Sequence, residues 1–161
     1  MQKVTTCLGF NNQAEEAVNL YTSVIPNSKI LSAVRNGESG PGPKGSLLVA
    51  TFLLDGQEFM AINGGAPFTF TMGMSIVRKC ETQAEIDELW ERLSEGGQKI
   101  ECGWLTDRFG VSWQIVPAAL GQWMSDAKRA PAVLTALMQM KKLDIATLQQ
   151  AYEQAGAGER V

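Results

Sequence analysis

Histidine is absent from the whole sequence of 161 residues, and this absence excludes more chemistry than any other feature of the chain. Histidine is the commonest general base and a principal protein ligand of transition metals. Without it, Ser-His and Cys-His nucleophile pairs and imidazole-based metal sites are excluded. Any general base or metal ligand must therefore come from another type of residue.

Cysteine and long apolar runs are also scarce. The three cysteines, Cys7, Cys80 and Cys102, are an odd number and lack C-x-x-C spacing, which indicates neither a disulfide framework nor a zinc ribbon. No apolar run approaches the roughly 20 residues that cross a bilayer, and the first residues do not read as a secretory signal. We therefore expect a cytoplasmic protein.

Clustered positive charge is missing as well. The net charge is −3, and no long basic patch occurs along the chain. A surface of this kind does not attract nucleic acid or an anionic membrane, so we expect neither as a partner.

The most informative stretch that is present is GWLTDRFGVSWQIVP, residues 103–117, which predicts two strands joined by a tight turn. Asp107 and Gly110 supply the turn, because Asp can bond its own backbone and Gly tolerates positive φ. In the second strand, the period of two separates Trp113 from the face that holds Ser112 and Gln114. If that polar face lines a cavity, Gln114 is its central polar group.

The predicted elements repeat in one order: a strand, a helix and three strands, twice over. The clearest trace of the repeat is QAEEAVNLY from Gln13 against QAEIDELW from Gln83. Two βαβββ units each expose one apolar sheet face, and pairing the units buries both. The expected strands cover residues 3–10, 28–35, 47–54, 57–63, 72–80, 99–104 and 111–116, and the expected helices cover 13–25 and 83–94.

We therefore predict an α+β fold in which duplicated βαβββ modules form a curled mixed sheet. Residues 1–161 are expected to be a single domain, with modules over 3–63 and 71–117 and a helical extension over 118–155. In the extension we expect a helix over 118–124 and a second over 131–154, with Asp144 as a cap for its last segment. The Gly- and Pro-rich loop 36–46 is a connector, a lid or an arm to a partner.

Three segments resemble a known family: FNNQAEEAVNLYTSVIPNSKI, LDGQEFMAINGG, and GWLTDRFGVSWQIVP followed by a Met-Lys-Lys-rich helix. Over residues 3–155 the chain is similar to the PhnB-like branch of the vicinal oxygen chelate superfamily, which has the glyoxalase/bleomycin resistance fold. Members often carry the label 3-demethylubiquinone 3-methyltransferase. The resemblance implies paired modules whose sheets curl round a cavity, often with a divalent metal held from four inward-facing strand positions.

By alignment of the repeats, these four positions fall at Thr5 or Thr6, about Met60, about Ser75, and Gln114. Only Gln114 is a possible metal ligand, because Thr, Met and Ser bind divalent ions weakly. A shift of register by one residue would at best bring in Glu58. We therefore expect neither a metal nor another cofactor.

The methyltransferase label lacks support in the sequence. A methyl donor needs a Gly-rich turn between a strand and a helix, with an acidic residue for the ribose. Gly64 and Gly65 follow a strand but lead into Ala66-Pro67-Phe68, where no helix is predicted.

Three functions stay open at this point. The first is a small-molecule-binding protein whose ligand the sequence does not identify. The second is an enzyme of the superfamily, a lyase, isomerase or dioxygenase with or without a divalent metal, using a carboxylate base (Glu58, Glu101 or Asp107) or a thiol. The third is an interaction module that dimerises through its C-terminal helix; we expect a homodimer in each case. The candidate cavity residues for the first are Thr6, Phe59, Asn63, Phe68, Phe70, Trp104, Trp113 and Gln114.

Overall fold

The computed structural model describes residues 2–64 and 67–157. The chain divides into two compact units, Met1–Thr69 and Phe70–Val161, which are described separately below. The expected single domain over the whole chain stays a prediction. Within the described residues, no helix is long and apolar enough to cross a membrane.

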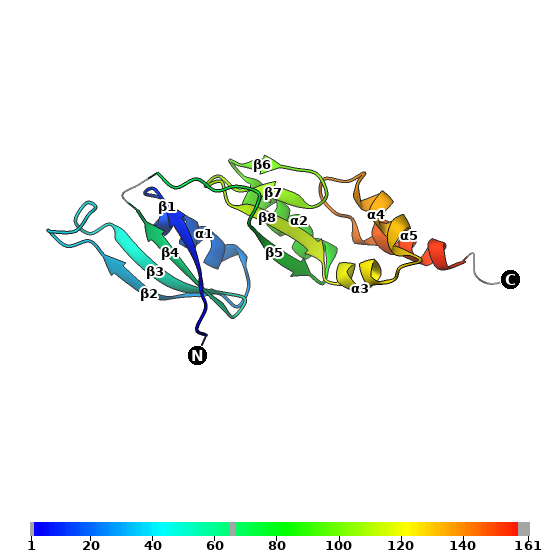
Figure 1. Cartoon of the computed structure of the whole chain (residues 1–161), viewed down its shortest axis with the longest axis horizontal. Coiled ribbons are helices and arrows are strands. Elements are labelled where there is room, and N and C mark those ends of the chain that lie inside the picture. Colours follow the sequence, from blue (N-terminus) through cyan, green and yellow to red (C-terminus); the bar gives the residue numbers. More distant parts are fainter. Residues whose placement is uncertain (1, 65–66, 158–161) are drawn as a thin grey trace. The chain divides into compact units, whose positions relative to one another are not determined.

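The first unit is one βαβββ module (Figure 1). Its elements are β1 (Thr6–Phe10), α1 (Ala14–Val24), β2 (Lys29–Arg35), β3 (Leu47–Leu54) and β4 (Gln57–Asn63). The sheet order is β1-β4-β3-β2, with β1 parallel to β4 and the other pairs antiparallel. Asp55 and Gly56 both have positive φ, 47° and 78°, which the two-residue loop between β3 and β4 requires.

Helix α1 covers one face of this sheet. Its buried stripe includes Ala17, Val18 and Tyr21, and the helix packs on β3 and β4. Neither Asn11 nor Asn12, which precede the helix, caps it, and the side chain of the N-cap residue Gln13 makes no cap bond. The side-chain Oδ1 of Asn63 at the end of β4 instead accepts a hydrogen bond from the Ala14 amide, at 2.9 Å.

The second unit repeats the module. Its elements are β5 (Ser75–Cys80), α2 (Gln83–Ser94), β6 (Gln98–Lys99), β7 (Trp104–Thr106) and β8 (Ser112–Pro117). The sheet order is β5-β8-β7-β6, with β5 parallel to β8, so each element has its counterpart in the first unit. The predicted duplication is confirmed, and each module forms a four-stranded sheet of its own.

The turn between β7 and β8 depends on Asp107, which is buried. One of its carboxylate oxygens accepts hydrogen bonds from the Phe109 and Val111 amides, at 2.9 and 3.0 Å. The other accepts a bond from the indole Nε1 of Trp113, at 3.0 Å. The predicted turn role of Asp107 is confirmed, and both of its oxygens are occupied by that role.

Two predicted boundaries were wrong. The strand expected over 99–104 is interrupted, because Cys102 and Gly103 have positive φ, 62° and 82°, and turn the chain before β7. The long helix expected over 131–154 is two helices, α4 (Ala130–Leu137) and α5 (Ile145–Ala157). Asp144 caps α5 as predicted, because its Oδ1 accepts a hydrogen bond from the Thr147 amide at 2.8 Å.

The helical extension consists of α3 (Leu120–Ser125), α4 and α5. The extension has a small core of its own, which includes the last buried valine of β8. The members of this core are Val116, Trp123, Val133, Leu143 and Leu148.

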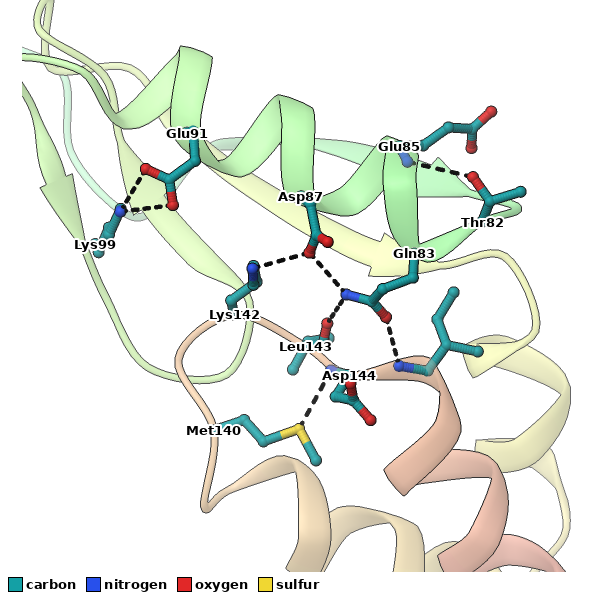
Figure 2. A network of polar contacts seen from close by, with 11 residues as sticks. Thr82, Gln83, Glu85, Asp87, Glu91, Lys99, Met140, Lys142, Leu143 and Asp144 are labelled. Carbon is teal, nitrogen blue, oxygen red and sulfur yellow. Dashed lines mark hydrogen bonds and ion pairs between the residues drawn. The ribbon is translucent and has the colours of Figure 1, made fainter.

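Gln83 ties the extension to α2, as Figure 2 shows. Its Nε2 donates to the Leu143 carbonyl at 3.0 Å, and its Oε1 accepts from the Ile145 amide at 2.8 Å. An ion pair between Lys142 and Asp87, at 2.9 Å, lies beside it. One side chain thus satisfies backbone groups on both sides of Asp144, in the segment that joins α4 to α5.

We predict that Gln83→Ala destabilises the protein by about 1–3 kcal/mol, because two backbone groups lose their partner. Chemical unfolding monitored by circular dichroism measures the change. Gln149→Ala, at an exposed position of α5, is the matched control and should change stability little. Equal effects of the two substitutions would contradict the role assigned to Gln83.

We also predict that the second unit loses stability in acid. Hydrogen bonds from Gln83 and Lys142 lower the pKa of Asp87, and bonds from the Thr147 hydroxyl and amide lower the pKa of Asp144, both from an ordinary value of 3.8. A carboxylate with a lowered folded-state pKa contributes stability above the unfolded-state pKa and loses it as pH falls through the folded-state value. Thermal unfolding should therefore show a loss below about pH 4 that is smaller in the Asp87→Asn, Asp144→Asn double variant. An unchanged pH dependence in that variant would contradict the assignment.

Candidate functional site

Each sheet has one face buried under its helix and one open face, and the open face of the second unit carries a set of polar side chains. Paired residues on neighbouring strands share a face, so the register of β5, β8 and β7 gives two rows. We call them the two-row site. One row is Val77, Gln114 and Trp104, and the other is Ser75, Ser112 and Thr106.

Gln114 is the central group of the two-row site. Its Nε2 donates to the Ser75 hydroxyl at 2.9 Å, and Trp104 is its direct cross-strand neighbour. The amide oxygen and the second N–H of Gln114 stay available in this arrangement. The structure thus brings together two predicted site residues, Gln114 and Trp104, with Ser75 from the family alignment.

Ser112 adds an unusual feature to this face. The residue is 1% exposed, and its hydroxyl has no hydrogen-bond partner among the described residues. A buried hydroxyl without a partner costs folding free energy, so such groups in a native protein call for an explanation. This one lies opposite Ser75, in the row next to Gln114.

Three predicted cavity residues lie on the covered faces instead. Trp113 is fully buried in the core of the second unit and bonds Asp107. Phe59 is 6% exposed and stacks on Phe52, with ring centroids 5.8 Å apart, and Thr6 is its register partner on the same face. The cause is the period of two: a strand beneath one helix directs every second side chain into the core.

Phe68 lies over the open face of the first unit. Asn11 holds its backbone, accepting from the Phe68 amide at 2.7 Å. A Cβ placed on Gly9 or Gly64 would lie 3.0 or 2.1 Å from the Phe68 ring, so a side chain at either position would have to displace the ring. The sequence analysis did not identify these two glycines as contacts of the Phe68 ring. A glycine inside a strand, as at position 9, often marks a site where another group approaches the backbone closely.

The other predicted residues have local roles. Asn63 caps α1 and also donates to the Leu47 carbonyl at 3.0 Å. Phe70 is half-buried and lies against the turn at Gly110. Gly65 and Ala66, part of the supposed donor-site turn, lie outside the described residues.

The donor set does not fit a divalent metal. On the open face of the first unit, the Thr5 hydroxyl bonds Glu58 at 3.3 Å, and Met60 lies two residues further along β4. Ser75 and Gln114 are the corresponding groups of the second unit. Among the described residues, no group of three or more Cys, Asp or Glu side chains is placed to hold an ion. Hydroxyl, thioether and amide groups are poor replacements for the carboxylates and imidazoles of such sites.

Two of the thiols, Cys7 and Cys80, have raised pKa values. Burial raises the pKa of Cys80 to about 11, and desolvation raises the pKa of Cys7. A reactive cysteine needs the opposite shift. Glu101 is exposed, with Lys141 at 3.6 Å. These groups give little support to the nucleophile or the Glu101 base considered from the sequence.

The comparisons agree on a family. A model described as 3-demethylubiquinone-9 3-methyltransferase matches residues 2–116. A Bacillus cereus PhnB protein with the same description is 44% identical over 71% of this chain and 99% of its own, with a TM-score of 0.68. A Pseudomonas aeruginosa protein is 25% identical over 73% and 98%, with a TM-score of 0.61.

A more distant structure shares the fold. The fosfomycin resistance protein FosX of Listeria monocytogenes is 17% identical over 75% of this chain and 94% of its own, with a TM-score of 0.54. No curated protein sequence matches the chain significantly. The protein therefore belongs to the family described as 3-demethylubiquinone-9 3-methyltransferase, whose PhnB-like members have the glyoxalase/bleomycin resistance fold.

Proposed function

We propose that this protein binds a small molecule without a metal, on the two-row site of its second unit. The observation that carries the proposal is the Gln114–Ser75 hydrogen bond beside Trp104, on a sheet face that no helix of the module covers.

The chemistry of the site favours a neutral ligand with a flat apolar body and one polar group. The side chains of both rows are uncharged, so an ionised ligand would find no counter-charge among them. Trp104 offers an indole surface for stacking, and Val77 an apolar flank. Gln114 can donate to or accept from one polar group of the ligand. Quinone-like and phenolic molecules meet these requirements.

The proposal does not include methyl transfer. A methyl donor of the nucleoside type is held at the start of a helix that follows a strand directly. In the described part of the chain after β4, Gly64 and residues 67–74 are not helical, and the next helix, α2, follows β5. The family description therefore says which proteins this chain is related to. The arrangement of the site supports the binding of a small molecule and gives no support to methyl transfer.

We further propose that the protein is a homodimer. Strand β2 lies at the edge of its sheet, and none of its seven residues is buried. Ile30, Leu31 and Val34 on this strand are 44–51% exposed. An edge strand with large apolar side chains tends to be covered, and a second copy of the chain is the partner that is always available.

We place the protein in the cytoplasm, where its cysteines would stay reduced. Cys7, Cys80 and Cys102 are unpaired in the structure, as thiols generally are in that compartment. Cell fractionation with a specific antibody tests this placement, and recovery with a membrane or periplasmic fraction would refute it.

We predict that Gln114→Ala weakens the binding of neutral quinone-like molecules such as menadione by about fivefold, which is the effect of one lost hydrogen bond. Quenching of tryptophan fluorescence measures the affinity. Gln122→Ala, on an exposed position of α3, is the control and should bind as the unmodified protein does.

The same samples test the absence of a metal. Elemental analysis of protein purified without chelator should find no stoichiometric Ni, Zn, Mn or Fe, and added ions should not raise the melting temperature. A stoichiometric metal would contradict the metal-free proposal and favour a metal-dependent enzyme of the vicinal oxygen chelate superfamily. If Gln114→Ala and Gln122→Ala bind the ligand equally well, the ligand does not bind on the face that carries Gln114.

For the dimer, we predict that the unmodified protein has twice the mass of one chain in light scattering, and that Val34→Glu gives single chains. A carboxylate at a buried apolar contact is strongly unfavourable. Val4→Glu, at a position 84% exposed, is the control. A monomeric unmodified protein would contradict the homodimer. A Val34→Glu variant that is still a dimer would show that β2 does not form the contact.

A further inference from the structure

A hollow lies in the first unit, whereas the two-row site belongs to the second. It has a volume of about 380 Å³, within the range of pockets that hold small molecules. It lies between the loop 36–46, the turn at residues 11–12 and the adjoining ends of β3 and β4. The side chains and turns that this argument uses are Asn12, Asn36, Pro41, Pro43, Leu48 and Asn63.

Asn36 holds the loop in place and thereby forms one wall. This buried amide donates to the Ser46 hydroxyl at 2.9 Å and accepts from the Gly42 amide at 3.4 Å. A Cβ on Gly40 or Gly42 would lie 2.6 or 2.8 Å from the amide atoms of Asn36, so the loop can wrap around this side chain only with glycine at both positions. The loop 36–46, for which the sequence left open a connector, a lid or an arm, is thus held at the ends of β2 and β3, the two strands that it joins.

Asn63 forms the opposite wall and is equally fixed. Its oxygen accepts from the Ala14 amide and its nitrogen donates to the Leu47 carbonyl. One N–H of this amide is left over for another acceptor. A site with walls fixed before the ligand arrives loses less entropy on binding.

The lining has amides and apolar surface but no charge. Among the described residues around the hollow, none is Asp, Glu, Lys or Arg. Arg35, next to Asn36 in the chain, is engaged by the Glu15 carboxylate, which it contacts through both terminal nitrogens. An ionised ligand would therefore lose its hydration without gaining a counter-charge.

We propose that this hollow binds a small neutral cyclic amide, of the kind found in a pyrimidine base. The pyrrolidine rings of Pro41 and Pro43 and the side chain of Leu48 supply apolar walls for a flat ring. At the edge of the ring, the side-chain amide of Asn12 can pair with a ring amide through both a donor and an acceptor, and the remaining N–H of Asn63 can donate to a ring carbonyl. The proposal is independent of the function assigned to the two-row site.

Three probes of similar size test it: uracil, its carboxylated and ionised analogue orotate, and toluene. Titrations of the full-length protein are followed by ¹⁵N NMR through the side-chain amide signals of Asn12, Asn36 and Asn63. Uracil should shift these signals saturably, and orotate and toluene should not. No saturable shift with uracil, or orotate or toluene binding as tightly as uracil, would overturn the proposal.

Two matched pairs of variants locate the site. Asn12→Ala should weaken uracil binding about fivefold, by the loss of one hydrogen bond, and Asn19→Ala on the exposed side of α1 should not. Leu48→Trp should fill the hollow and abolish binding, and Leu53→Trp on the same strand should preserve it. The amide spectrum shows whether each variant is folded. If Leu48→Trp is misfolded, the asparagine pair decides, and equal affinities in that pair would overturn the assignment.

Discussion

One helix can cover only one face of a four-stranded sheet, and the rest of this structure depends on that constraint. In each module the β-strand period of two places one set of side chains against the helix and the other set on the open face. Phe52 and Phe59 are buried in this way in the first unit, and Leu105, Trp113 and Ile115 in the second. The same alternation that builds the core therefore also selects which residues remain for binding.

The fold could be predicted well from the sequence because its signals are local. Apolar spacing located both module helices, Asp55-Gly56 located a hairpin, and Asp107 was assigned to a turn, where the structure places it. Details could not be predicted where the decisive interaction is distant in sequence. The amide of Ala14 is capped by Asn63, and residues on both sides of Asp144 are fixed by Gln83; neither contact follows from neighbouring residues.

The candidate site could be predicted only in part, for a related reason. Gln114 was identified from alternation within one strand, but its partner Ser75 lies on another strand, and only the register of β5 against β8 brings the two together. Aromatic residues were misjudged because composition does not say which face they occupy: Trp104 lies on the open face and Trp113 in the core. The hollow beside Asn36 could not be predicted from the sequence, because its walls come from a loop, a turn and two strand ends that are separate along the chain.

The helical extension of the second unit lies beyond the region that the family model matches, which ends at residue 116. Val116 shares the open face of β8 with Gln114, two residues away, and is buried in the core of the extension. The extension therefore covers the end of the face that carries the two-row site. Its position depends on the bonds of Gln83, a residue of the matched region, so the extension is anchored by the module whose open face it shortens.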